Sequence, residues 1–200
     1  MHRKASLQIK NNLRKKEFNT MIELLKLYFV QTGCGWAILG AIIVVTVSCL
    51  GSAKGILIAS SQAAGVLSEK PELFGKMLVL MALPGTQGFY GFIGAIMIAL
   101  RTGVIAGHIS ISPSVGLAIL AIAICMGIVE YFTALMQAKA ATAAINLTGK
   151  QPEEGGRAIL IPALVETYAV IALLISILLI TWLTKEGGIS YSPRTGTEIW

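Results

Sequence analysis

The chain has 200 residues, of which 55% are hydrophobic and 13% are charged, about half the charged share of a soluble globular domain. Seven of its 16 basic residues lie in the first 26 positions, and no aromatic side chains interleave with them to stack on bases. The formal charge of +6 therefore does not indicate a nucleic-acid partner, and the composition argues against a soluble enzyme.

Four long runs with almost no charge divide the chain. They hold 27, 24, 28 and 27 residues between charged side chains, and only the last is interrupted, by Glu166. Each run exceeds the roughly 20 apolar residues that a helix needs to cross the hydrocarbon core, and a helix satisfies its own backbone in lipid. The sequence therefore predicts an all-α membrane protein with four transmembrane helices, at about 33–59, 73–100, 114–147 and 155–184.

The two halves of the chain are similar. Pro71 and Pro152 each open a span after a short polar loop, as proline does in the first turn of a helix. Fourteen residues after these prolines come Gly85 and Glu166, so only the second half carries a carboxylate at that place. Because each half has two spans, both point the same way across the membrane. We expect two tandem, parallel-repeated helical hairpins, 33–100 and 114–184, with short loops at 60–72 and 148–157 and the surface residue His108 in the middle connection.

Glu166 is the strongest functional feature of the sequence. It lies nine residues beyond Arg157, which is roughly 14 Å along a helix and close to the middle of the membrane. An ionised carboxylate at that depth costs at least about 2.5–3.5 kcal/mol. The side chain therefore needs a partner, a proton or a cation.

Several polar side chains are expected at the depth of Glu166. Gln137 lies 15 residues before Pro152 and Glu166 lies 14 after it, so a tight hairpin brings the two together. Thr86 and Gln87 lie 15 and 16 residues after the proline that opens the second span. Taken singly, each of these residues could have a purely structural role, as a hydrogen-bond partner of a neighbouring helix. Together they predict a cation site, because hard cations prefer oxygen ligands.

Tyr90 and Pro84 add to this cluster. Tyr90 shares a helix face with Thr86, since residues three or four apart are neighbours on a helix. Pro84 lacks a backbone donor and loosens its turn, which can free a nearby carbonyl group.

Other polar groups within the spans are open to more than one interpretation. Glu130 precedes Gln137 by seven residues, on the same helix face. It is a candidate second ion site, proton relay or residue facing a water-filled space, and the sequence does not choose between them. Lys54 and Lys139 are expected to extend to the interface at the short loops. The three cysteines are Cys34, Cys49 and Cys125. They lack the spacing of metal ligands, and we expect them to be small buried residues.

Three segments resemble the signature segments of a known family: LPGTQGFYG at 83–91, VETY at 165–168 and GSAKG at 51–55. They are similar to the proteolipid (K or c) subunit of V-type ATPases and ATP synthases, especially the bacterial sodium-translocating kind. The resemblance covers about residues 21–184. It implies that many four-helix subunits assemble into a rotor ring, with one ion-binding carboxylate in each copy.

The resemblance also implies a set of site residues. The Na⁺ ligands would be the Leu83 backbone carbonyl, Thr86, Gln87, Gln137 and Glu166, with Tyr90 holding the carboxylate by a hydrogen bond. Glu130 is not part of the family pattern. Because the site has neutral oxygens that a proton would not need, Na⁺ is the expected ion and H⁺ is the alternative. No organic cofactor is expected.

The implied function is ion transport coupled to ATP hydrolysis or synthesis. The protein would itself be non-catalytic, an integral multi-pass protein of a bacterial cell membrane. Its partners would be identical subunits, a stator membrane subunit, central-stalk subunits and the lipid bilayer. A small multidrug and proton exporter is a less favoured alternative, because that class carries its glutamate in the first helix and has an aromatic drug pocket. A purely structural scaffold leaves Glu166 unexplained.

The tails depart from the family pattern. Residues 1–32 form a basic tail, and Met21 is a candidate true start, so that residues 1–20 would come from an upstream start codon. N-terminal sequencing that found Arg3 in the membrane-purified protein would contradict this hypothesis, and a genuine basic surface helix is the alternative. The family keeps its termini outside, whereas a basic tail favours the inside under the positive-inside rule. Residues 185–200 form a C-terminal tail with no assigned role.

Overall fold

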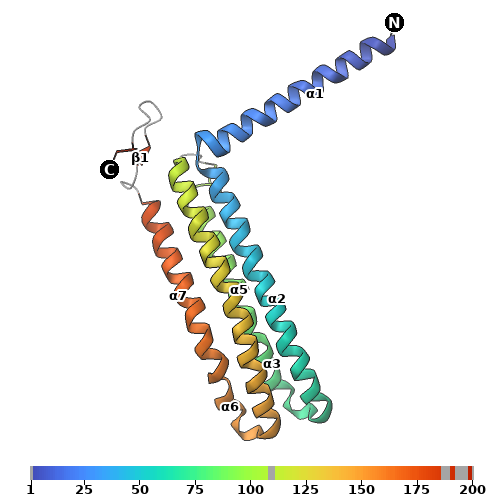
Figure 1. The fold of residues 1–200 in the computed structure, drawn as a ribbon, viewed down its shortest axis with the longest axis vertical. Helices are drawn as coiled ribbons and strands as arrows, with labels where there is room; N and C mark the ends of the chain where they lie inside the picture. Colours follow the sequence, from blue (N-terminus) through green and yellow to red (C-terminus); the bar gives the residue numbers. More distant parts are fainter. Residues whose placement is uncertain (1, 108–110, 186–189, 192–197, 200) are drawn as a thin grey trace.

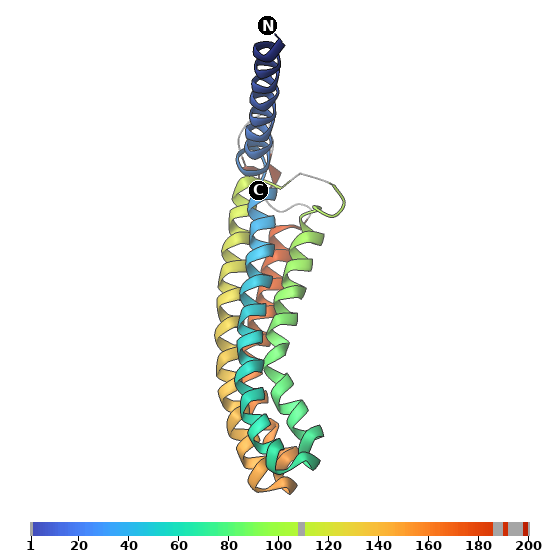
Figure 2. The same ribbon diagram turned by 90° about the vertical axis from the view of Figure 1, so that its right-hand side faces the viewer.

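A computed structural model describes residues 2–107, 111–185, 190–191 and 198–199, and of residues 2–11 and the last two pairs it describes the backbone alone. In the described chain, four helical stretches are long and apolar enough to cross a membrane, and they lie side by side in one bundle (Figures 1 and 2). The prediction of an all-α, multi-pass membrane protein is confirmed. The four stretches are Cys34–Glu69, Pro71–Arg101, Pro113–Lys150 and Pro152–Leu183.

The first hairpin contains one long helix and one broken helix. Its elements are α2 (Cys34–Glu69), the 3₁₀ turn η2 (Pro71–Leu73), α3 (Phe74–Ala82), the 3₁₀ turn η3 (Leu83–Gly85) and α4 (Thr86–Arg101). The loop predicted at 60–72 is wrong in its extent, because α2 continues through Glu69. Ala59 and Ala63 are fully buried in an apolar cluster with Met77, so packing keeps this stretch helical where the hydrophobic run has ended.

The second hairpin repeats this pattern. It consists of α5 (Pro113–Lys150), the 3₁₀ turn η4 (Pro152–Glu154), α6 (Gly155–Ala158) and α7 (Leu160–Leu183). The Ser112 hydroxyl accepts a hydrogen bond from the Val115 N–H at 3.3 Å, and Pro113 occupies the first turn of α5. This is a standard helix start, with a serine N-cap followed by proline. The loop predicted at 148–157 is likewise shorter, because α5 continues through Lys150.

Both hairpin loops lie at one end of the bundle, and the middle connection lies at the other end (Figure 1). The two hairpins therefore have the same orientation, as predicted. The long helices α2 and α5 make the most extensive contact and form a central pair. Helix α4 packs mainly on α2, and α7 packs mainly on α5.

The interior has two apolar clusters with polar groups between them. Ala37, Val44 and Ile119 belong to the cluster nearer the middle connection, and Met77 and Ala144 belong to the cluster at the hairpin loops. The intervening layer holds buried polar side chains from three helices, Ser48, Ser52, Gln87, Glu130, Thr133 and Gln137. The membrane protein thus places hydrogen-bonding groups where the sequence predicts mid-membrane depth.

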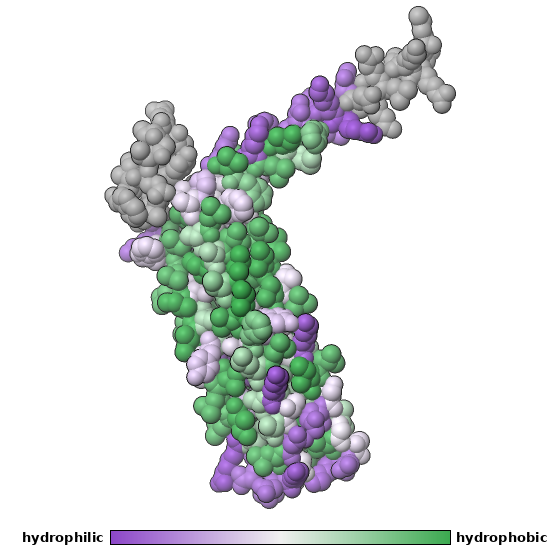
Figure 3. Space-filling model, viewed as in Figure 1, coloured by the Kyte–Doolittle hydropathy of each residue, from purple (hydrophilic) through white to green (hydrophobic). Residues whose placement is uncertain are grey.

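The outer surface fits a lipid environment. Hydrophobic residues cover most of the visible flank of the bundle, and hydrophilic ones gather at the hairpin loops (Figure 3). Cys34 is buried as expected, but Cys49 and Cys125 are exposed on this surface of the single chain. For these two cysteines the prediction of burial is wrong. Cys49 lies on the face of α2 that borders α4, where its Sγ is 4.0 Å from the Gly88 carbonyl oxygen.

The N-terminal segment forms a helix that projects from the bundle (Figures 1 and 2). Helix α1 (His2–Lys26) runs into the π-helical turn η1 (Leu27–Gln31) and then joins α2. The junction is bonded: the Trp36 indole N–H donates to the Phe29 carbonyl at 2.9 Å, and the Thr32 hydroxyl donates to the Leu27 carbonyl at 2.9 Å. In the C-terminal tail, β1 (Ser190–Tyr191) pairs antiparallel with β2 (Glu198–Ile199). His108 lies outside the described residues.

Two glycines allow α2 and α5 to approach closely. A Cβ atom on Gly51 would lie 2.6 Å from the Tyr131 Cα, and one on Gly55 would lie 3.0 Å from the Ala134 carbonyl oxygen. Small residues at helix contacts are the usual means of close packing in membranes. By contrast, a Cβ on Gly65 of the same helix would meet nothing within 4 Å.

We therefore expect opposite effects from two substitutions in α2. Gly51→Ala pushes α2 away from α5 and should destabilise the bundle by about 1–3 kcal/mol, the usual cost of overpacking. Gly65→Ala meets open space and should leave stability unchanged or raise it, since alanine favours helix more than glycine does. Thermal unfolding of the purified protein in detergent measures both. Equal melting temperatures for the two variants would contradict the close contact at Gly51.

Candidate functional site: a polar cluster around Glu166

The second transmembrane stretch is interrupted where the site begins. Pro84 has no N–H to donate to the preceding turn, and the chain forms the 3₁₀ turn η3 at Leu83–Gly85 before α4 starts. The Leu83 carbonyl accepts the Thr86 N–H and the Thr86 hydroxyl, the latter at 3.0 Å. The expected loosening at Pro84 is therefore present, and it concentrates backbone and side-chain oxygens at one point.

Two buried glutamines link this turn to α5. Gln87 and Gln137 are both fully inaccessible. The Gln87 Nε2 donates to the Gln137 Oε1 at 2.6 Å, and the Gln87 Oε1 lies 3.4 Å from the Thr86 Oγ1. Each glutamine thus directs one polar atom at the other, which satisfies groups that would otherwise be costly to bury.

Glu166 completes the cluster from α7. The Tyr90 hydroxyl donates to its Oε1 at 2.6 Å, and the Gln137 Nε2 lies 3.4 Å from its Oε2. The same Nε2 donates to the Pro162 carbonyl at 3.2 Å. The structure thereby brings all six predicted residues into one hydrogen-bonded chain, Leu83, Thr86, Gln87, Gln137, Glu166 and Tyr90.

The carboxylate lies at the edge of the bundle. Glu166 is half-buried, whereas its helix neighbours Leu164 and Tyr168 are 70% and 66% exposed. One side of the carboxylate therefore faces the two hydrogen-bond donors, and the other is close to the outer surface. A group placed in this way can exchange a proton or a cation with a neighbouring molecule without opening the bundle.

The chemistry of the cluster is that of an alkali-cation or proton site. Among the described residues no three His, Cys, Asp or Glu side chains come together, so the cluster lacks the ligands that a transition metal prefers. It offers instead one carboxylate and several neutral oxygens. A monovalent cation would be neutralised by the single charge and coordinated by the remaining oxygens.

Sequence reasoning missed two partners of the cluster. The Pro162 carbonyl accepts from Gln137, and the signal was a proline inside the fourth span, four residues before Glu166. The Ser52 hydroxyl accepts the Gly88 N–H at 2.7 Å, which ties α4 to α2 next to the site. No spacing rule within one helix indicates that second bond, because it joins helices from different parts of the chain.

Lys54 behaves differently from the prediction. Its ammonium group bonds the Tyr131 hydroxyl at 2.7 Å and lies 5.2 Å from the centre of that ring. It therefore contacts α5 on the exposed side of the bundle, and this hydrogen bond holds it there. The prediction that it extends to the interface overlooked this cross-helix partner.

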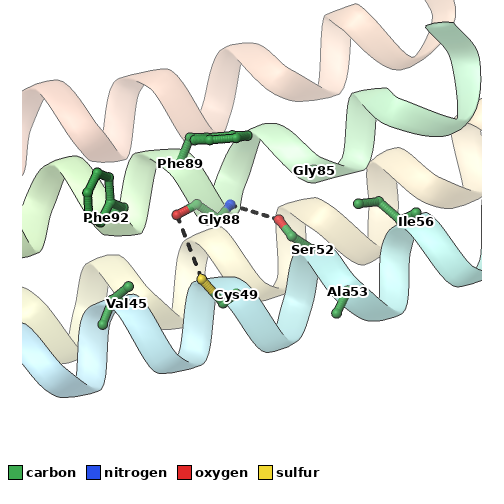
Figure 4. A pocket seen from close by; sticks show the side chains of 9 residues that line it. All are labelled: Val45, Cys49, Ser52, Ala53, Ile56, Gly85, Gly88, Phe89 and Phe92. Carbon is green, nitrogen blue, oxygen red and sulfur yellow. Dashed lines mark hydrogen bonds between the residues drawn. The ribbon is translucent and has the colours of Figure 1, made fainter.

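An apolar groove of about 510 Å³ runs along the α2–α4 contact beside the cluster. Figure 4 shows its nine lining residues and the bond from Gly88 to Ser52 across its floor. Phe89 and Phe92 line it from α4, and Val45 and Ile56 from α2. None of the lining side chains carries a charge, so the groove adds no charged ligand to the cluster.

The comparisons with known proteins agree with this architecture. A model of the family described as the ATP synthase C subunit matches residues 39–98 and 120–179, once in each hairpin, which confirms the predicted duplication. Over 148 residues the chain is 36% identical to the V-type sodium ATPase subunit K of Enterococcus hirae, covering 74% of this chain and 92% of that protein. Over 146 residues it is 35% identical to the A-type ATP synthase subunit K of Methanocaldococcus jannaschii, covering 73% of this chain and 62% of that protein. The chain therefore belongs to the ATP synthase C-subunit family, as a proteolipid rotor subunit of the V-type and A-type ATPases.

The bond from Tyr90 to Glu166 makes a testable contribution. A hydrogen bond to a carboxylate favours its ionised form and is worth about 1.5–3 kcal/mol. Tyr90→Phe should therefore speed the labelling of Glu166 by a carbodiimide, roughly tenfold, because a carboxyl group that has lost its hydrogen-bond donor is less firmly held and more open to attack. Mass spectrometry of labelled membranes gives the rate. Tyr131→Phe is the matched control, since it loses only its bond to Lys54; equal rates in the two variants would contradict the role of Tyr90.

Proposed function

We propose that this rotor protein transports Na⁺ across the membrane on Glu166 as the ring turns. The single observation that carries the proposal is the cluster of oxygens around one mid-membrane carboxylate, with contributions from η3, α4, α5 and α7. The ligands are the Leu83 carbonyl, Thr86, Gln87, Gln137 and Glu166. A relative whose name specifies a sodium ATPase supports the choice of ion.

The neutral oxygens favour Na⁺ over H⁺ as the transported ion. A proton needs only the carboxylate and one acceptor or donor to orient it. Here the Thr86 hydroxyl lies 3.0 Å from the Leu83 carbonyl and 3.4 Å from the Gln87 amide oxygen. Binding of a proton to the carboxylate does not require these additional oxygens. They provide the partial negative charges that replace the hydration shell of a small cation. Transport of H⁺ by the same carboxylate is the alternative.

Only one ion is expected for each set of four helices. We take residues 33–100 and 114–184 as two functional halves, related by the tandem family match. The second half carries Glu166, and the matching position of the first is Gly85. Gly85 has no side chain that could bind an ion, so the first hairpin contributes neutral ligands and Tyr90 instead of a second carboxylate.

The position of Glu166 at the bundle edge suits ion-coupled rotation. When the ion neutralises the carboxylate, the site can face lipid at low cost, whereas a bare carboxylate could not. A cationic group of a stator membrane subunit would displace the ion and release it to the other side. Each elementary charge moved is worth about 2.3 kcal/mol per 100 mV, so several ions must pass for each ATP. Identical subunits would form the ring, and central-stalk subunits would connect it to the sites of ATP chemistry.

The deciding experiment is carbodiimide labelling of purified membranes at graded Na⁺ concentrations, with the labelled residue located by mass spectrometry. We expect labelling at Glu166 that Na⁺ suppresses and that K⁺ at the same ionic strength suppresses far less. Labelling at Glu166 that ignores Na⁺ would replace the sodium assignment by a proton ring. Labelling confined to Glu130 would refute the assignment of the site.

The neutral ligands can be tested one at a time. Thr86→Val keeps the shape of the side chain but removes its oxygen, so we expect the Na⁺ concentration that half-protects Glu166 to rise roughly tenfold, the loss of one polar contact to a charge. Thr142→Val is the matched control, because within the described chain the Thr142 hydroxyl bonds the Lys139 carbonyl of its own helix and no residue of the cluster. If Thr86→Val leaves the protecting concentration unchanged, its hydroxyl is not a ligand.

A further inference from the structure

A second carboxylate, Glu130, lies inside the bundle and has no part in the cluster around Glu166. Its residue exposure is 0%, and neither of its carboxylate oxygens has a hydrogen-bond partner in the described chain. By contrast, both oxygens of Glu166 contact a donor. An ionised, unpartnered carboxylate in an apolar interior is among the costliest arrangements in a protein, so the state of Glu130 requires a physical explanation.

Contacts on either side fix the level of Glu130 in the bundle. One turn before it, Gly127 lies against Val44 and Val47 of α2, and just after it the Tyr131 backbone lies against Gly51. The Ser48 hydroxyl of this part of α2 donates to the Val44 carbonyl at 2.7 Å and is thus engaged within its own helix. Glu130 therefore lies at the boundary between the polar layer and the apolar cluster of Val44 and Met126.

The ionisable groups on the helices packed around Glu130 offer it no counter-ion. On α2, α4, α5 and α7 most of them are exposed, either on the flank or at the helix ends, namely Cys49, Lys54, Glu69, Arg101, Cys125, Lys139, Lys150 and Tyr168. Tyr131 is engaged with Lys54. The other three are Cys34, which is buried at the start of α2, Tyr90 of α4, and Glu166 of α7, to which Tyr90 donates. The buried groups on these helices therefore include no cation that could balance an ionised Glu130.

We propose that Glu130 is a proton-binding site inside the bundle, separate from the Glu166 cluster, and that its proton controls how strongly the cluster binds its cation. A proton is the ligand that fits, because the surroundings provide neither a positive charge nor a ring of free oxygens for a metal ion. The neutral acid removes the cost of a buried charge. On ionisation the proton passes to solvent, and the charge left behind acts on the neighbouring site through the bundle interior.

The sign of this control follows from the geometry. Glu130 is seven residues from Gln137 on the same helix face, which is roughly 10 Å along α5. At an effective dielectric constant near 20, a unit negative charge at that distance strengthens cation binding on the order of tenfold. A ring with neutral Glu130 therefore binds Na⁺ more weakly than one in which it is ionised, and alkaline conditions favour the tighter state.

The proton can be observed directly, without reference to ion transport. Infrared spectroscopy separates the C=O stretching band of a carboxylic acid from the bands of carboxylates. In wild-type rings saturated with Na⁺ at neutral pH, where Glu166 is ionised, we expect one acid band from a buried group. Glu130→Gln should abolish it. An absent acid band, or one that persists unchanged in Glu130→Gln, would overturn the proposal; if the variant does not assemble, ¹³C-glutamate labelling of the wild type still shows whether a glutamic acid is present.

The control of ion binding rests on the proposed function and is tested separately. Half-protection of Glu166 from carbodiimide by Na⁺ is measured against pH in the wild type and in Glu130→Gln, whose amide mimics the neutral acid. We expect equal protecting concentrations at neutral pH and, at alkaline pH, protection of the wild type at concentrations lower on the order of tenfold. Parallel curves at every pH would refute the control. If Na⁺ protects neither form, the sodium assignment fails, while the infrared result still decides whether Glu130 holds a proton.

Discussion

A carboxylate at the middle of a membrane must receive hydrogen bonds, a proton or a cation, and much of this bundle is arranged around that requirement. Glu166 obtains donors from Tyr90 on α4 and Gln137 on α5, so three of the four spans meet at one side chain. The buried glutamine pair extends the bonds inward to η3. Removing the carboxylate would leave these polar groups without a shared partner in an otherwise apolar interior.

The same requirement accounts for the breaks in the outer helices. The central helices α2 and α5 are continuous and pack closely through Gly51 and Gly55. The second stretch is broken by the 3₁₀ turn η3, in which the proline at 84 lies beside the Leu83 carbonyl. The fourth stretch is interrupted at Ile159, between α6 and α7. Irregular backbone is tolerated at membrane depth where it is buried or serves a polar site. The continuous helices α2 and α5 thus form the scaffold, and the interrupted outer stretches supply backbone and side-chain groups to the site.

The two intramembrane carboxylates illustrate how environment decides the role of one residue type. Glu166 is half-buried, bonded on both oxygens and adjacent to the outer surface, a position suited to exchange with a neighbouring molecule. Glu130 is fully buried and has no hydrogen bond to its carboxylate in the described chain, so a neutral acid fits there. One polar layer therefore contains one carboxyl group bonded at the bundle edge and one that is fully buried without a bonded partner in the described chain.

The sequence by itself determined the number of spans, their parallel duplication and the polar side chains that share the depth of Glu166. These follow from charge-free runs long enough to cross hydrocarbon, from prolines that mark equal depth, and from the cost of Glu166 at that depth. Only the tertiary structure decided the continuation of α2 to Glu69, the partner of Lys54, the role of the Pro162 carbonyl and the isolation of Glu130. The reason is physical: depth along a helix is set by local spacing, whereas a hydrogen bond between helices depends on rotation and lateral packing, which contacts distant in sequence determine.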